Sequence, residues 1–157
     1  MAHKTDSVAV NAGLVLTHLK AKTRQEAIAT LASLLLKQHL VDDGYSEAVL
    51  AREEVYPTGL PLPDIPVAIP HTEAGHCKSP AMAVGILDRP VEFGEMGAEP
   101  GSMLQVRIVF LLALNNPKTQ VDFLQRLVAL FQEPGLLAEL VRLRKPSLVA
   151  DFLCSHL

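Results

Sequence analysis

The longest runs of near-continuous apolar residues in this 157-residue chain predict strands that are buried on both faces. The strongest run covers residues 105–114, and a second run covers residues 81–87. A shorter run at residues 67–69 is stopped at once by Pro70. Residues 8–16 are also apolar, although Asn11 and Gly13 interrupt them, and we expect a short early strand there.

Apolar residues repeat at helical spacing in other parts of the chain. The clearest start signal is Thr23, followed three residues later by Glu26, because this pair forms a capping box in front of an apolar stripe. Pro57 stops the second helix, and Asn116-Pro117 precedes the third. The predicted helices cover residues 24–38, 47–56, 118–132, 136–143 and 147–154.

The segments between these elements are rich in proline, glycine or acidic residues. Residues 58–66 contain three prolines and predict a stiff loop that leads into the short strand at 67–69. Residues 91–101 predict a connection, and residues 1–7 a loose tail. Helices mixed with buried strands indicate an α/β fold, which we expect to be a single-domain layered sandwich over residues 1–157.

Composition narrows the class of function. The net charge is −3 without any basic block, and tryptophan is absent, so we expect no nucleic-acid partner. No apolar run is long enough to span a bilayer and no signal peptide is visible, which predicts a cytoplasmic protein without membrane insertion. Cys77 and Cys154 are the only cysteines, and two cysteines do not form a disulfide framework.

The best candidate for chemistry is His71, which directly follows Pro70 at the end of the short strand. Histidine changes charge near neutral pH, and a strand end would hold its ring in a fixed and exposed position. A neutral imidazole can attack a phosphoryl group or accept a proton. The alternative is a histidine that only satisfies a backbone group.

Other polar residues could support such a centre. Arg52 could clamp a phosphate with two hydrogen bonds, and Thr58 or Thr72 could add a hydroxyl. Gln120 falls in the first turn of a predicted helix, where an anion is favoured. His76 could orient His71 or its phosphate. With no nucleotide or metal motif, a phosphoryl relay fits better than hydrolysis.

Two segments resemble a known family. The run at residues 51–60, Ala-Arg-Glu-Glu-Val-Tyr-Pro-Thr-Gly-Leu, and the run at 69–76, Ile-Pro-His-Thr-Glu-Ala-Gly-His, are similar to the IIA component of the bacterial sugar phosphotransferase system. The resemblance is to the fructose/mannitol superfamily, and in particular to its galactitol-type branch. Residues 109–132 match the strand and helix of that family, and the likeness extends over residues 10–155.

The resemblance implies a fold and a function. The fold would be a mixed β-sheet of about five strands flanked by helices. The domain would accept a phosphoryl group from the phosphocarrier HPr on His71 and pass it to a cysteine of a IIB component, while a IIC component moves the sugar through the membrane. Arg52 would stabilise the phosphate. Gln120 stands where many members have a second histidine, and Asp64 lies near the position of a family acid.

The resemblance also implies that the protein needs no cofactor or metal and that it is a monomer or a weak homodimer. Two other functions remain open. Relatives of the nitrogen type act as regulatory modules that report their phosphorylation state to other proteins. A metal-dependent enzyme could use His71, His76 and Cys77, although their spacing fits none of the recurrent zinc patterns.

Overall fold

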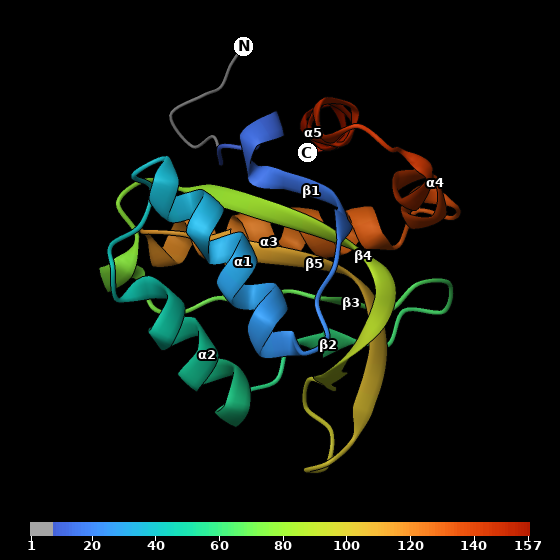
Figure 1. Cartoon of the computed structure of the whole chain (residues 1–157), viewed down its shortest axis with the longest axis horizontal. Helices are drawn as coiled ribbons and strands as arrows, with labels where there is room; N and C mark the ends of the chain where they lie inside the picture. The colour runs from blue at the N-terminus through green and yellow to red at the C-terminus, as the bar shows by residue number, and fades with distance from the viewer. Residues whose placement is uncertain (1–7) are drawn as a thin grey trace.

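The computed structural model, which describes residues 8–157, contains one five-stranded mixed sheet between two layers of helices (Figure 1). The expected α/β sandwich is confirmed, and the tail predicted at residues 1–7 lies outside the described residues. The strands, in sheet order, are β1 (Val15–Leu19), β4 (Ala81–Gly94), β5 (Met103–Ala113), β3 (Val67–Ala68) and β2 (Gly59–Leu60). The β1–β4 and β3–β5 pairs are parallel, whereas β4–β5 and β2–β3 are antiparallel.

Each face of the sheet is covered by its own group of helices. Helices α1 (Arg24–Lys37) and α2 (Tyr45–Val55) pack on one face, against side chains such as Val109 and Leu111 of β5. Helices α3 (Pro117–Phe131), α4 (Leu136–Arg142) and α5 (Pro146–His156) pack on the other, against Ile108 and Phe110. Successive residues of β5 therefore face opposite cores, as the run of apolar residues predicts. Two short 3₁₀ helices, η1 (Ala12–Leu14) and η2 (Ala74–His76), complete the elements.

The prediction of a connection over residues 91–101 was wrong for residues 91–94, because the connection between β4 and β5 begins only after Gly94. Residues Val91–Gly94 continue β4 and pair with β5, from Val91 opposite Val106 to Gly94 opposite Met103. An irregularity in the pairing between Ile86 and Val91 hides this continuity from the sequence pattern. Beyond it, the buried Val91 and Phe93 alternate with the exposed Glu92, which is the period of a strand.

Three predicted boundaries also shift. The early strand is Val15–Leu19 rather than residues 8–16, because the Asn11 side chain accepts a hydrogen bond from Gly13 N and turns the chain into η1. Helix α2 begins at Tyr45 rather than at Glu47, and the buried Tyr45 donates its hydroxyl hydrogen to Leu112 O. The first residues of the predicted stiff loop include the short strand β2. Among the described residues, no helix is both long and apolar enough to cross a membrane.

Candidate functional site

The strands β3 and β5 run parallel, so their carboxyl ends reach the same edge of the sheet. His71 follows β3 at this edge, and helix α3 begins shortly after β5. A hydrogen bond from Leu112 N to Pro70 O, 3.0 Å long, continues the pairing of the two chains beyond β3 itself. The backbone next to His71 is therefore held against the buried second half of β5.

The His71 ring is held in one orientation by its own backbone. Its Nδ1 lies 2.8 Å from the carbonyl oxygen of Ile69, and since a carbonyl only accepts, Nδ1 carries the hydrogen. The lone pair of the neutral ring therefore lies on Nε2. The ring is half-buried, not exposed as expected from the strand end. Burial, together with the charge of Arg52, lowers the pKa of His71 below 6.5, although the bond to Ile69 O opposes this shift.

Arg52 lies in the last turn of α2, and its positive charge is near enough to lower the pKa of His71. Its guanidinium carbon is 5.0 Å from the centre of the Tyr56 ring, a cation–π distance that helps to fix the side chain. The Nε atom is buried and has no hydrogen-bond partner among the described residues. A buried donor without a partner is costly, so this atom is suited to an anion placed beside His71.

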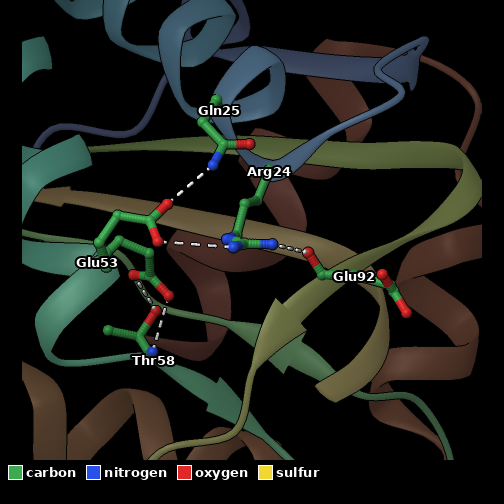
Figure 2. Close-up of polar contacts among 6 residues, drawn as sticks. Arg24, Gln25, Glu53, Thr58 and Glu92 are labelled. Atoms are coloured by element: carbon green, nitrogen blue, oxygen red, sulfur yellow. Dashed lines mark hydrogen bonds and ion pairs between the residues drawn. The ribbon is translucent and has the colours of Figure 1, made fainter. Parts of the chain in front are cut away.

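Next to Arg52, Glu53 and Thr58 form a buried polar pair (Figure 2). One carboxylate oxygen of Glu53 accepts from Thr58 N and the other from Thr58 Oγ1, both at 2.9 Å. The Thr58 hydroxyl oxygen in turn accepts from Ile69 N at 3.2 Å. Glu53 thus fixes Thr58, and Thr58 holds the residue whose carbonyl orients the His71 ring.

The pKa of Glu53 is raised from 4.5 to about 7, because burial disfavours its charged form. The two hydrogen bonds from Thr58 and the charge of Arg24 oppose the shift, and the nearby charge of Glu54 adds to it. At neutral pH this carboxyl therefore lies close to the midpoint of its titration.

A more exposed set of contacts joins the start of α1 to the end of α2 (Figure 2). Gln25 Nε2 donates to Glu54 Oε1 at 2.8 Å, and Arg24 forms an ion pair of 3.6 Å with Glu54 Oε2. Arg24 also reaches the carbonyl of Glu92 at 3.5 Å. These contacts connect the helix that carries Arg52 to the rest of its layer.

The other predicted site residues differ in burial and in the groups that they contact. Thr58 is buried, and its hydroxyl hydrogen is directed to Glu53, so in this structure it supports the strand and does not face an open site. Thr72 follows His71 and is half-buried. Gln120 lies in the first turn of α3, at the same edge of the sheet. Asp64 is exposed in the segment before β3.

His76 is directed to Asp42 rather than to His71. Its Nδ1 is 2.9 Å from Asp42 Oδ1, and this bond lowers the pKa of Asp42. The pair ties η2 to the turn before α2. Cys77 Sγ donates to Ser79 O at 3.2 Å. Within residues 8–157, no group of three or more His, Cys, Asp and Glu side chains is close enough to hold a metal ion.

Glu53 is the site residue that the sequence reasoning missed. A signal was present, because Tyr45, Val49 and Glu53 are spaced by four residues and all three are buried on one face of α2. A carboxylate on the buried stripe of a helix requires partners, and these are found in Thr58, five residues later.

Comparison with known proteins places these features in context. Residues 9–155 match the family described as the phosphoenolpyruvate-dependent sugar phosphotransferase system, EIIA 2. The chain is 31% identical over 129 residues to the galactitol-specific EIIA component of this system in Escherichia coli. The aligned residues make up 82% of this chain and 85% of the relative.

Two solved structures share the fold. One is the complex of the mannitol enzyme IIA with phosphorylated enzyme IIB of Escherichia coli, with a TM-score of 0.75 and 23% identity, covering 95% of this chain and 99% of that one. The other is the nitrogen regulatory protein IIA-Ntr of Neisseria meningitidis, with a TM-score of 0.71 and 20% identity, covering 92% and 95%.

Proposed function

The chain belongs to the EIIA type 2 family of the phosphoenolpyruvate-dependent sugar phosphotransferase system, and from this premise we propose that it accepts a phosphoryl group from phospho-HPr on His71 and passes it to a IIB component during sugar uptake. The resemblance inferred from the two sequence motifs is thereby confirmed at the level of the family. The observation that carries the proposal is the buried, unpartnered Nε of Arg52 beside a histidine that is neutral at physiological pH.

In the first step, Nε2 of His71 is the nucleophile, because Nδ1 keeps its hydrogen on the Ile69 carbonyl. A bond forms between Nε2 and the phosphorus while the bond from phosphorus to the donor nitrogen of phospho-HPr breaks. The ring then carries more positive charge, and the Ile69 carbonyl, already 2.8 Å from Nδ1, stabilises it as the acceptor. The lowered pKa of His71 keeps the lone pair available at pH 7.

Arg52 stabilises the phosphoryl group on which negative charge is concentrated during transfer. Its Nε donor has no hydrogen-bond partner in the part of the chain that the structure describes, so a hydrogen bond to a phosphoryl oxygen would replace no existing one. Charge stabilisation and positioning account for most of the catalysis in phosphoryl transfer. Gln120 and Thr72 would contribute weaker polar contacts around the group, Asp64 would act only from the rim, and His76, which is bonded to Asp42, would not contact it.

In the second step the phosphoryl group leaves His71 for a cysteine thiolate of IIB, and Nε2 recovers its lone pair. The complex of the mannitol IIA with phosphorylated IIB, whose fold this chain shares, supports a partner of this kind. The 31% identity to a galactitol-specific EIIA supports a polyol, with galactitol as the first candidate. The transfer would take place in the cytoplasm.

The decisive experiment is phosphorylation with labelled phosphoenolpyruvate, enzyme I and HPr. Wild-type chain should acquire acid-labile label, and His71→Ala should acquire none. His156→Ala is the matched control, because His156 is an exposed histidine near the end of α5, and it should be labelled like wild type. Full labelling of His71→Ala, or none of wild type, would contradict the proposal.

A second stage separates transport from regulation. When IIB is added to the labelled chain, the label should move to IIB. Label that remains on His71 in the presence of IIB would favour the regulatory alternative, for which the shared fold with the nitrogen regulatory IIA is the supporting observation.

A further inference from the structure

Arg107 resembles Arg52 in one respect. Within residues 8–157, these are the two side chains with a buried polar atom that has no hydrogen-bond partner, and in both the atom is Nε. Arg107 lies on β5, five residues before Leu112, whose amide contacts Pro70. At the rise of a strand this separation is about 17 Å, so Arg107 lies toward the other end of the sheet from His71.

Arg107 lines a surface groove of about 460 Å³ between the end of β1, the middle of β4 and the end of α4. Figure 1 shows α4 beside the end of β1, on the side of the sheet that α5 also covers. Arg142 and Arg144 line the same groove and are exposed. Thr17 Oγ1 donates to Arg144 O at 3.0 Å, which fastens the segment after α4 to β1 and keeps the groove in shape.

The charge of the groove is strongly positive in a chain whose net charge is −3. Its lining contains three arginines and one carboxylate, Asp88. That carboxylate is occupied by His18, whose Nδ1 lies 3.3 Å from Asp88 Oδ1. None of the three guanidinium groups forms an ion pair with another described residue. The positive charge is therefore not balanced by the part of the protein that the structure describes.

A guanidinium group presents a planar fork of donors that matches phosphate or carboxylate oxygens. The volume of the groove lies within the range of about 300–1,000 Å³ that small-molecule sites occupy. The half-buried Val141 adds an apolar side chain beside the arginines, whereas Ile86 and Leu87 of the lining are buried. An apolar side chain in this position suits the carbon skeleton of an organic anion better than a bare inorganic ion.

We propose that this groove binds a small organic phosphate, with the phosphate on Arg107, Arg142 and Arg144 and the carbon skeleton beside Val141. The site is separate from His71 and contains no free nucleophile, so it binds the ligand without reacting with it. The proposal is independent of the phosphocarrier role. It makes the protein responsive to a phosphorylated metabolite at a second position.

The test is a titration of ¹⁵N-labelled protein with a hexose 6-phosphate, with inorganic phosphate and the unphosphorylated hexose as the other two arms. The organic phosphate should shift the amide signals of Thr17, Arg107 and Arg144 in a saturable way, and should bind more tightly than inorganic phosphate. The titration is repeated with His71→Ala, which should leave these shifts unchanged.

Substitutions of the groove arginines test which side chains bind the phosphate. Arg142→Gln/Arg144→Gln should weaken binding by about tenfold or more, and Arg107→Lys, which keeps the charge but loses the fork, should weaken it as well. Arg89→Gln is the matched control, because Arg89 is exposed close to the groove without lining it, and its affinity should equal that of wild type.

Three outcomes would overturn the assignment. They are shifts confined to the surroundings of His71, equal affinity for inorganic and organic phosphate, and equal affinity in the variants and wild type. Groove signals that respond only to HPr or IIB, and not to the hexose phosphate, would instead identify a protein-docking surface and also overturn it.

Discussion

Arg52 and Arg107 lie near opposite ends of the same sheet, and each has a buried Nε without a hydrogen-bond partner among residues 8–157. Their surroundings differ. Beside Arg52 is His71, with its ring fixed by the Ile69 carbonyl and its pKa lowered, so that an anion bound there meets a nucleophile. Beside Arg107 the one histidine, His18, is bonded to Asp88. Under the two proposals, the same donor would serve group transfer at one end of the sheet and reversible binding at the other.

The largest expected effect is on the rate of phosphorylation and concerns Arg52. Arg52→Gln should lower the rate of phosphorylation by phospho-HPr by about 100-fold, because removing a preorganised charged donor has a cost of this order. Arg89→Gln makes the same change of charge at an exposed position and should retain the wild-type rate.

A second measurement on the same variant excludes a loss of folding as the cause. Since the charge of Arg52 lowers the pKa of His71, Arg52→Gln should raise it, as followed by the ring signals in an NMR titration. A normal rate, or an unchanged His71 pKa, would remove Arg52 from the site.

The next effect concerns Thr58 and Glu53, which hold the backbone that orients His71. The groove at Arg107 has no corresponding pair. Thr58→Val should reduce the free energy of unfolding by about 2 kcal/mol, because it removes the hydroxyl donor from one oxygen of the buried Glu53 carboxyl group. The amide contact to Glu53 can persist, but the hydroxyl contact is lost. Denaturant unfolding measures the change.

Thr58→Ser keeps the hydroxyl and serves as the control. In the double variant Glu53→Gln/Thr58→Val the loss should be smaller than the sum of the two single losses, because a neutral amide has less need of the threonine. Additive losses would show that the two side chains do not act as a pair.

The pH dependence of stability tests the same pair. The pKa of Glu53 is about 7 in the folded chain and near 4.5 when exposed. Between these values the folded state binds a proton that the unfolded state does not, so stability should fall as pH rises from about 4.5 to about 7 and then level off. Glu53→Gln should flatten this part of the profile, as measured by melting temperature from pH 5 to pH 8.

His71 works in the opposite direction in the same experiment. Its pKa is lowered on folding, so the unfolded state binds more protons just below pH 6.5, and this residue contributes stability that is lost as pH falls through that range. His71→Ala should remove only this contribution. A profile that is the same in Glu53→Gln and in the wild type would show that folding does not raise the pKa of Glu53.

Much of this site could be predicted from local sequence, and the reason is physical. Pro70 stops a strand and places His71 at its end, and the run of residues 51–60 carries Arg52 one helix away. The rest depends on the fold. The burial of Glu53 requires α2 to pack on the sheet, and Thr58 reaches it because the chain enters β2 at Gly59, where a Cβ atom would lie 2.5 Å from the Gly94 carbonyl oxygen.

The groove was beyond prediction for a similar reason. Arg107 is a single polar position inside an apolar run, and nothing near it in sequence indicates an anion site. Arg142 and Arg144 look like ordinary residues at the end of a helix. Only the packing of α4 beside β1 and β4 brings the three cations together. The irregularity that hid the second half of β4 lies next to the same groove, between Ile86 and Val91.

The smallest expected effect tests whether Arg107 is there for folding. If its unpartnered Nε is retained for a ligand, Arg107→Met should be neutral or should stabilise the free protein by up to about 1 kcal/mol, because an apolar side chain of similar length replaces an unsatisfied donor. The hexose 6-phosphate should raise the melting temperature of the wild type and leave that of Arg107→Met unchanged, since a ligand stabilises only the state that binds it. A loss of more than about 2 kcal/mol in Arg107→Met would show instead that this arginine supports the sheet. Arg107 would then share with Arg52 only the missing hydrogen bond, and not a role in binding an anion.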